Sequence, residues 1–174
     1  DEIELPLIPI LADIELTGMK VNGDSLKKFS EYISGELESL REKITNIAGR
    51  EFNIGSPKQV GEVFGELNIE TGKKTATGQV STSHDVLVEL AETYEIARHI
   101  IDYRELDKLR ATYADALPKM IASDGRVHGA LNQTVAATGR LSSTEPNLQN
   151  IPVRTELGQQ IRRAFIPEPG NKLI

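Results

Sequence analysis

Apolar residues recur every three or four positions over several stretches of the chain, the spacing that places them on one face of an α-helix. The strongest stretch is 24–48, between Asp24, which can cap a helix start, and Gly49, which can stop one. Its apolar positions are Leu26, Phe29, Ile33, Leu37, Leu40, Ile44 and Ile47. Weaker periodicity predicts helices over 5–17 and 96–117, the second disturbed at its end by Pro118. The two long helices indicate an antiparallel pair, or stalk.

Two short helices with well-formed starts are predicted between the long ones. Residues 56–59 (Ser-Pro-Lys-Gln) place a cap, a proline at the first helical position and a glutamine three residues after the cap. Residues 82–85 (Thr-Ser-His-Asp) read as a second capping box. The polar stretch 70–81 between them, rich in Gly and Thr, predicts a mobile loop.

The pattern changes after Gly125. Residues 126–135 alternate as a strand does, with Val127, Gly129, Leu131, Gln133 and Val135 on one face. A long irregular segment to residue 154, a short helix near 156–164 and the start of an apolar strand at 172 follow. The fold class expected is mainly α with a small β part (α+β).

Composition narrows the class of protein. The 174 residues are 39% hydrophobic, enough for a real core, and contain no Cys, which excludes a disulfide scaffold, a zinc ribbon and a Cys nucleophile. No apolar run approaches the ~20 residues that a bilayer span needs, and no basic-then-apolar leader opens the chain, so we expect a cytoplasmic protein without a membrane partner. The net charge is -6, yet residues 126–166 hold five Arg and only two acidic residues. Charge alone fits a polyanion-binding surface and a few solvated arginines equally well.

The segment 138–154 (TGRLSSTEPNLQNIPVR) concentrates arginines, serines and side-chain amides in a loop punctuated by prolines. Such groups are costly to bury unpaired, so they either satisfy one another or face a polar ligand. Individually, Ser142, Ser143 and Asn147 can equally be read as caps of turns. As a set they favour a ligand.

This segment closely resembles the family A DNA polymerases of bacteria. The matching runs are Gln-Thr-Val at 133–135, Ala-Thr-Gly-Arg-Leu-Ser-Ser at 137–143 and Pro-Asn-Leu-Gln-Asn-Ile-Pro-Val-Arg at 146–154. Further matches at 52–59, 81–83, 103–113 and 161–165 extend the resemblance over essentially the whole chain. It implies a thumb subdomain at 1–125, with its tip at about 52–90, and the N-terminal part of a palm at 126–174, incomplete at its C-terminus.

The resemblance also implies DNA-binding residues in the palm part. Arg140 is expected at the primer terminus, where the minor groove presents acceptors at nearly equivalent places in every base pair. Asn147, Gln149 and Asn150 are similar to residues that contact the minor groove and backbone of the primer–template. Arg154 matches an arginine near the phosphates of the incoming nucleotide.

In the thumb part the resemblance implies contacts to the DNA backbone, which a helix N-terminus can bind through its free N–H groups. The expected residues are Ser56, Lys58, Lys73, Lys74, Ser81, Thr82 and Ser83 at the tip, with Arg104 and Lys108 on the stalk. Ordinary helix capping is the alternative for the tip serines and Thr82. Ion pairs with Asp107 and Glu105 are the alternative for Arg104 and Lys108.

No catalytic or metal-binding residue is expected in this stretch. Nucleotidyl transfer needs paired carboxylates that hold two metal ions, and none of the acids after residue 100 forms such a pair. Mg²⁺, deoxynucleoside triphosphates, the fingers and the remaining palm are therefore expected of the complete polymerase, and the 174-residue chain is expected to be inactive.

The resemblance implies that this chain is the primer–template-binding portion of a template-directed DNA polymerase, working in replication and repair and associated with the bacterial nucleoid. The alternative is a non-catalytic helical interaction module derived from a polymerase thumb.

Overall fold

The computed structural model describes residues 2–72, 80–153 and 155–172. The chain divides into two compact units. Unit 1 consists of Asp1–Glu31 and Ala111–Ile174, and unit 2 of Tyr32–Arg110. The predicted thumb–palm boundary after residue 125 does not coincide with this division and stays a prediction.

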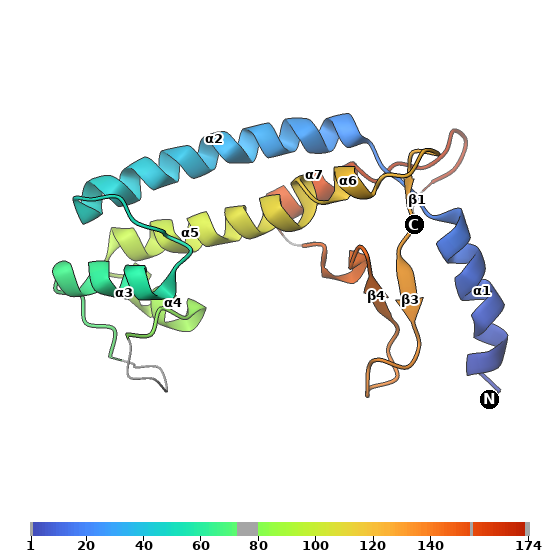
Figure 1. Ribbon diagram of the computed structural model, residues 1–174, viewed down its shortest axis with the longest axis horizontal. Helices are drawn as coiled ribbons and strands as arrows, with labels where there is room; N and C mark the ends of the chain where they lie inside the picture. The colour runs from blue at the N-terminus through green and yellow to red at the C-terminus, as the bar shows by residue number, and fades with distance from the viewer. Residues whose placement is uncertain (1, 73–79, 154, 173–174) are drawn as a thin grey trace. The chain divides into compact units, whose positions relative to one another are not determined.

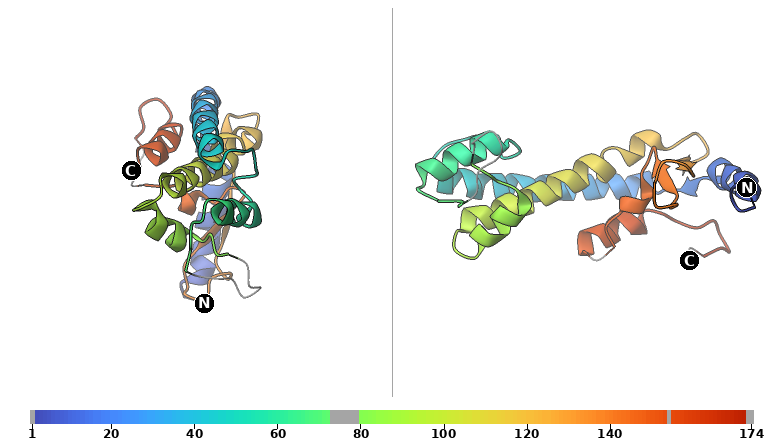
Figure 2. Two further views of the ribbon diagram at one scale, coloured as in Figure 1. Left: turned by 90° about the vertical axis from the view of Figure 1, so that its left-hand side faces the viewer. Right: turned by 90° about the horizontal axis from the view of Figure 1, so that it is seen from below.

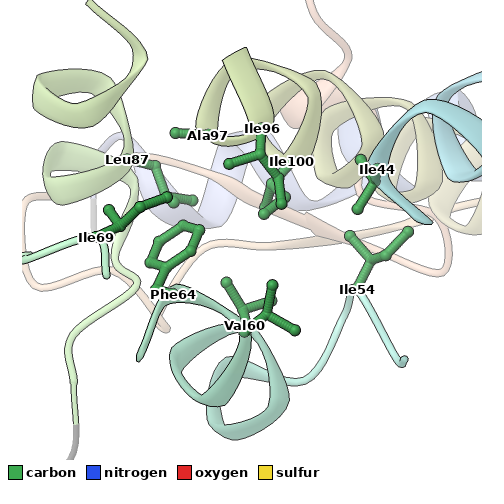
Figure 3. Close-up of a cluster of buried hydrophobic side chains, with 10 residues drawn as sticks. Ile44, Ile54, Val60, Phe64, Ile69, Leu87, Ile96, Ala97 and Ile100 are labelled. Atoms are coloured by element: carbon green, nitrogen blue, oxygen red, sulfur yellow. The ribbon is translucent and has the colours of Figure 1, made fainter. Parts of the chain in front are cut away.

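Unit 2 is helical. It contains most of α2 (Gly23–Ala48), α3 (Pro57–Glu66), α4 (His84–Ala91) and α5 (Glu95–Leu109). The part of α2 in this unit and α5 run side by side in opposite directions, and α3 and α4 form a small tip at one end of the unit (Figures 1 and 2). One hydrophobic core joins all four helices, as Figure 3 shows. Its buried members are Ile44, Ile54, Val60, Val63, Phe64, Ile69, Leu87, Ile96, Ala97 and Ile100.

The predicted helix over 96–117 is shorter than expected. Helix α5 ends at Leu109, a wider π-helical turn (η1) covers Arg110–Ala114, and the short α6 (Leu117–Met120) follows. Pro118 explains the break between η1 and α6, because it has no N–H to donate to the carbonyl group of residue 114 and its ring crowds that group. In α6 it lies in the first turn, where the missing N–H is not needed.

Unit 1 combines helices with two small antiparallel sheets. Helix α1 (Glu4–Thr17) ends at Gly18, whose φ of 62° suits glycine. Strand β1 (Met19–Lys20) pairs with β2 (Arg126–Val127), and β3 (Ala130–Asn132) pairs with β4 (Ser142–Thr144). The short 3₁₀ helix η2 (Leu148–Asn150) and α7 (Glu156–Arg163) complete the described elements of this unit. The expected fold class, mainly α with a small β part, is confirmed.

Three local predictions in unit 1 are corrected. The single strand over 126–135 is wrong, because the chain changes partner strand at residues 128–129 and Val135 is 70% exposed. The irregular segment before residue 154 contains β4 and η2. The periodicity of 5–17 predicts that Leu7, Ile10, Leu11 and Ile14 share one apolar face, yet Leu11 is buried while Ile10 and Ile14 are more than half exposed. The strand expected from 172 reaches residues 173–174, which lie outside the described residues.

Candidate nucleic-acid interface

Strands β3 and β4 form a hairpin that presents Arg140. Leu131 lies opposite Ser143 and Asn132 opposite Ser142, so residues 133–141 form the connection between the strands. The hairpin approaches the preceding chain closely, since a Cβ atom on Gly129 would lie 3.3 Å from the carbonyl oxygen of Thr144. Arg140 is exposed at the end of this connection and, among the described residues, has no hydrogen-bond or ion-pair partner. Its guanidinium group is therefore available to a ligand.

Ser143 fixes the turn that follows β4. Its side chain is buried, with 3% exposure, and its Oγ donates a hydrogen bond to the carbonyl oxygen of Pro146 at 3.1 Å. The same Oγ accepts a hydrogen bond from the N–H of Leu148 at 2.9 Å. The reading of this serine as a turn cap is thus confirmed. The hydroxyl group closes the turn that leads from β4 into η2.

The side-chain amides of Asn147, Gln149 and Asn150, at the N-cap of η2 and within it, make different contacts. Asn147 Oδ1 accepts a hydrogen bond from the N–H of Gln149 at 3.2 Å and so caps the turn. Gln149 Nε2 donates to the carbonyl oxygen of Leu141 at 2.9 Å, which ties η2 back to the hairpin. Asn150 is exposed and has no partner within the described part of the chain. All three residues are exposed, so their remaining donors and acceptors face solvent beside the hairpin.

A second set of contacts anchors the hairpin and the residues before it to both ends of α1. The N–H of Leu131 donates to the side-chain carboxylate of Glu15, and the amide of Gln133 donates to the carbonyl oxygen of Glu4 at 3.2 Å. His128 lies between two acceptors, the carbonyl oxygen of Glu15 at 2.8 Å from Nδ1 and the carboxylate of Asp124 at 3.1 Å from Nε2. Both ring nitrogens must carry a proton to donate, so the hydrogen bond to Glu15 and then that to Asp124 raise the pKa of His128.

Helix α7 continues from the same segment. Thr155 caps it through a hydrogen bond from the N–H of Gly158 at 3.1 Å, and Gly158 packs directly on Pro152. A Cβ atom at Gly158 would lie 2.4 Å from the carbonyl oxygen of Pro152, so only glycine fits there. Arg154, expected near the incoming nucleotide, lies outside the described residues.

The predicted tip residues of unit 2 lie at two helix starts. Ser56 caps α3 by accepting a hydrogen bond from the N–H of Gln59 at 3.4 Å, while the Gln59 side chain accepts from Asn53 instead of completing the capping box. Lys58 is exposed, and its Nζ lies 4.0 Å from Glu62. Lys73 and Lys74 lie outside the described residues.

The capping box predicted at 82–85 is wrong. Ser83 is the N-cap of α4 but makes no side-chain cap hydrogen bond, and it contacts Ser81 Oγ at 3.4 Å. Thr82 does not cap the helix either: it precedes the N-cap, and its Oγ1, buried with 5% residue exposure, has no partner among the described residues. Ser81 is half-buried, while Ser83 faces solvent.

On the stalk, Arg104 and Lys108 differ in their surroundings. Arg104 donates from Nε to the carbonyl oxygen of Ile54 at 3.3 Å and from Nη1 to that of Thr82 at 2.9 Å. Its partial burial lowers the pKa of its guanidinium group. Lys108 is exposed, and Asp107, considered as an ion-pair partner, contacts Arg110 at 3.3 Å. No local sequence signal pointed to the backbone partners of Arg104, which lie 50 and 22 residues away in the chain.

Neither a metal centre nor a membrane span emerges from the described residues. They contain no group of three or more His, Asp or Glu side chains that could hold a metal ion. None of their helices is both long enough and apolar enough to cross a bilayer.

Comparisons with known proteins identify the family to which this chain belongs. The model of DNA polymerase family A matches residues 23–174. The chain belongs to DNA polymerase family A. DNA polymerase I of Bacillus subtilis is 47% identical over 100% of this chain and 20% of its own length. DNA polymerase I of Pseudomonas aeruginosa is 47% identical over 99% of this chain and 19% of its own length.

A solved structure of the same family resembles the fold closely. The POL domain of Pol1 from M. smegmatis, in complex with DNA primer-template and dNTP, superimposes with a TM-score of 0.88 at 41% identity. The match covers 96% of this chain and 30% of that chain. This family A segment thus spans about a fifth of the length of the curated relatives named above.

Proposed function

We propose that this chain forms the primer–template-binding part of a template-directed DNA polymerase I, which performs nucleotidyl transfer in the complete protein. The observation that carries the proposal is the similarity, over 96% of the chain, to a polymerase domain solved with DNA primer-template and dNTP. The exposed, unpartnered Arg140 on its hairpin supports it, because a group held ready in this way suits a polar ligand. The division into thumb (1–125) and palm (126–174) is part of the proposal.

Arg140 is proposed to bind the minor-groove edge of the primer-terminal base pair. Purine N3 and pyrimidine O2 lie at nearly equivalent places there in all four base pairs. One arginine can therefore bond to every correct terminus, and a mispair that shifts the acceptor weakens that bond. The hairpin and the turn closed by Ser143 hold the backbone near Arg140, while its side chain stays open to solvent.

The neighbouring amides are proposed to widen this contact. Asn147 and Gln149 each use one polar atom within the turn and keep others exposed, and Asn150 keeps its whole amide exposed. They suit contacts to the groove edge and to sugar or phosphate oxygens, which position a protein without selecting a sequence. Arg154 is proposed to lie near the phosphates of the incoming deoxynucleoside triphosphate.

The tip of unit 2 is proposed to contact the duplex backbone. Ser56 and Ser83 stand at the starts of α3 and α4. At α4 no side chain caps the N–H groups of the first turn, which suit a phosphate oxygen, whereas at α3 Pro57 has no N–H and Ser56 Oγ already accepts that of Gln59, which leaves the N–H of Lys58. Lys58 and Lys108 are exposed and add positive charge. The set implied by the family resemblance also includes Ser81, Thr82, Lys73 and Lys74. The side chain of Thr82 is buried and its carbonyl oxygen accepts from Arg104, so any phosphate contact of this residue would use its backbone N–H.

Catalysis is proposed to depend on residues outside this chain. The described residues offer no acidic cluster that fits Mg²⁺, so the metal ions of the complete polymerase would be held elsewhere, in the remaining palm. We place the complete enzyme in the bacterial cytoplasm with the nucleoid, together with its fingers.

Binding of fluorescent primer–template duplexes, followed by anisotropy, tests the proposal. The 174-residue chain should bind weakly, without sequence preference, and its affinity should fall as salt rises because phosphate contacts release counterions. A preference above about 4 kcal/mol for one sequence would indicate a regulator instead. Absence of duplex binding at low salt would favour a helical interaction module.

A further inference from the structure

Arg104 joins two segments of unit 2 that are far apart in sequence. Its guanidinium group donates to the carbonyl oxygen of Ile54 at 3.3 Å and to that of Thr82 at 2.9 Å. Ile54 stands two residues before Ser56, the N-cap of α3, and Thr82 stands immediately before Ser83, the N-cap of α4. One side chain therefore holds the approaches to both helix starts.

A second contact holds the same two segments together independently of Arg104. Gly61, in the first half of α3, is buried, and a Cβ atom built on it would lie 3.2 Å from the Cβ atom of Val80. Val80 lies two residues before Thr82. The chain leading into α4 is thus packed closely on α3, so a change in the path of one segment bears directly on the other.

The guanidinium group of Arg104 is poorly placed for a phosphate. Nε and Nη1 are engaged by backbone carbonyl oxygens. Nη2 is buried and, among the residues that the structure describes, has no hydrogen-bond partner. A phosphate cannot reach a nitrogen that has no accessible surface, whereas Lys108, one helical turn further on, is exposed.

We propose that Arg104 is a positioning residue, which sets the spacing of the N-termini of α3 and α4 so that both meet the phosphate backbone of the duplex. The proposal rests on the proposed function, because it takes the two helix starts as DNA contacts. It assigns to Arg104 an effect on DNA binding that passes through the backbone at residues 54 and 82. Direct charge pairing with the DNA is left to Lys108.

The test compares Arg104→Met with Lys108→Met in the 174-residue chain. Each variant removes one positive charge from α5, so they are matched for charge. Amide hydrogen exchange without DNA should accelerate roughly ten- to a hundredfold around residues 54–59 and 82–87 in Arg104→Met, the range expected for lost charged hydrogen bonds. The same amides should exchange at the wild-type rate in Lys108→Met.

Salt dependence separates the two roles on DNA. Each phosphate contact contributes about 0.9 to the slope of log affinity against log salt. Lys108→Met should lower that slope by about this amount, and Arg104→Met should weaken binding with the slope unchanged. Arg104→Lys keeps the positive charge but loses the planar guanidinium group, so it should bind the duplex as weakly as Arg104→Met. It replaces Arg104→Met in the test if the methionine variant does not fold.

Unchanged exchange at both segments, together with a reduced slope in Arg104→Met, would overturn the proposal and make Arg104 a direct contact. Full binding by Arg104→Lys would overturn it as well, because charge alone would then suffice. A wild-type chain that binds no duplex would refute the proposed function, and the exchange measurement alone would then decide whether Arg104 fixes the two helix starts.

Discussion

Replacing Ser143 with alanine should loosen the turn beside Arg140 more than its small size suggests. The change removes one hydroxyl group from a buried position, with 3% exposure, and leaves the β4 backbone intact. That hydroxyl makes two hydrogen bonds, one to the carbonyl oxygen of Pro146 and one from the N–H of Leu148. Both partners belong to the turn that leads into η2.

The size of the destabilisation depends on the two backbone groups that lose their partner, the carbonyl oxygen of Pro146 and the N–H of Leu148. A buried polar group that loses its only partner costs about 1–3 kcal/mol. Pro146 is buried, but Leu148 is half-buried and can recover part of its loss from water. The expected local destabilisation is therefore about 2–4 kcal/mol for the two groups together.

Amide exchange at Leu148 measures this loss, and Ser142→Ala is its matched control. The hydroxyl of Ser142 is also buried but has no partner within the described residues, so its removal should cost less than about 0.5 kcal/mol or even stabilise the hairpin. Exchange at Leu148 should accelerate between about 30-fold and 1,000-fold in Ser143→Ala and stay near the wild-type rate in Ser142→Ala. Equal effects of the two alanine variants would refute the assignment of Ser143 as the residue that closes the turn.

Three further predictions concern other parts of the chain. The hydrogen bonds of His128 to Glu15 and Asp124 raise its pKa, so the stability that they contribute should be complete below the unfolded pKa of about 6.5 and disappear as pH rises through the higher folded value. The difference in Tm between wild type and His128→Asn should therefore shrink over this pH range. A difference that grows with pH would contradict this prediction. Gly158→Ala should destabilise unit 1 by about 1–3 kcal/mol in chemical denaturation, because the new Cβ atom would overlap Pro152. Gly35→Ala is the control: a Cβ atom there meets no neighbouring atom within 4 Å outside its own helix backbone, so this variant should be neutral or stabilising. The 174-residue chain supplied with primer–template, Mg²⁺ and all four deoxynucleotides should extend no primer in a gel assay, and template-dependent extension would overturn its assignment as non-catalytic.

Local patterns were sufficient where local forces decide. The apolar period of 24–48 predicted α2 to within a residue, and Ser56 with Pro57 marked the start of α3, because both signals act within one or two helical turns. The end of α5 was misplaced. Pro118 predicts the break before α6, but the α-helical hydrogen bonding already changes at Arg110, eight residues before the proline and beyond the reach of its ring.

Long-range packing decided the rest. Alternation over 126–135 shows which residues share a face of a strand, but not that β2 pairs with a strand 107 residues earlier while β3 pairs with the following β4. The sequences at 56–59 and 82–85 carry similar capping patterns, but only Ser56 makes a cap hydrogen bond, while Ser83 makes none and Thr82 Oγ1 is buried without a partner among the described residues. In the same way, motif matching singled out Arg140 and Arg104 alike, and only the three-dimensional contacts separate an open guanidinium group from one held by backbone carbonyls.

The most direct test of the central claim is a double-mutant cycle between Arg140 and the primer-terminal base in a complete family A polymerase that carries this segment. Arg140→Ala removes a charge-assisted hydrogen bond worth roughly 1.5–3 kcal/mol, so single-nucleotide extension should slow about 10- to 100-fold, equally for all four terminal pairs. Arg140→Lys should rescue only part of this loss. A terminal analogue without its minor-groove acceptor should slow the wild type but add little to the loss in Arg140→Ala. Additive slowing by the variant and the analogue would contradict the account, because Arg140 would then not bind the terminal base pair.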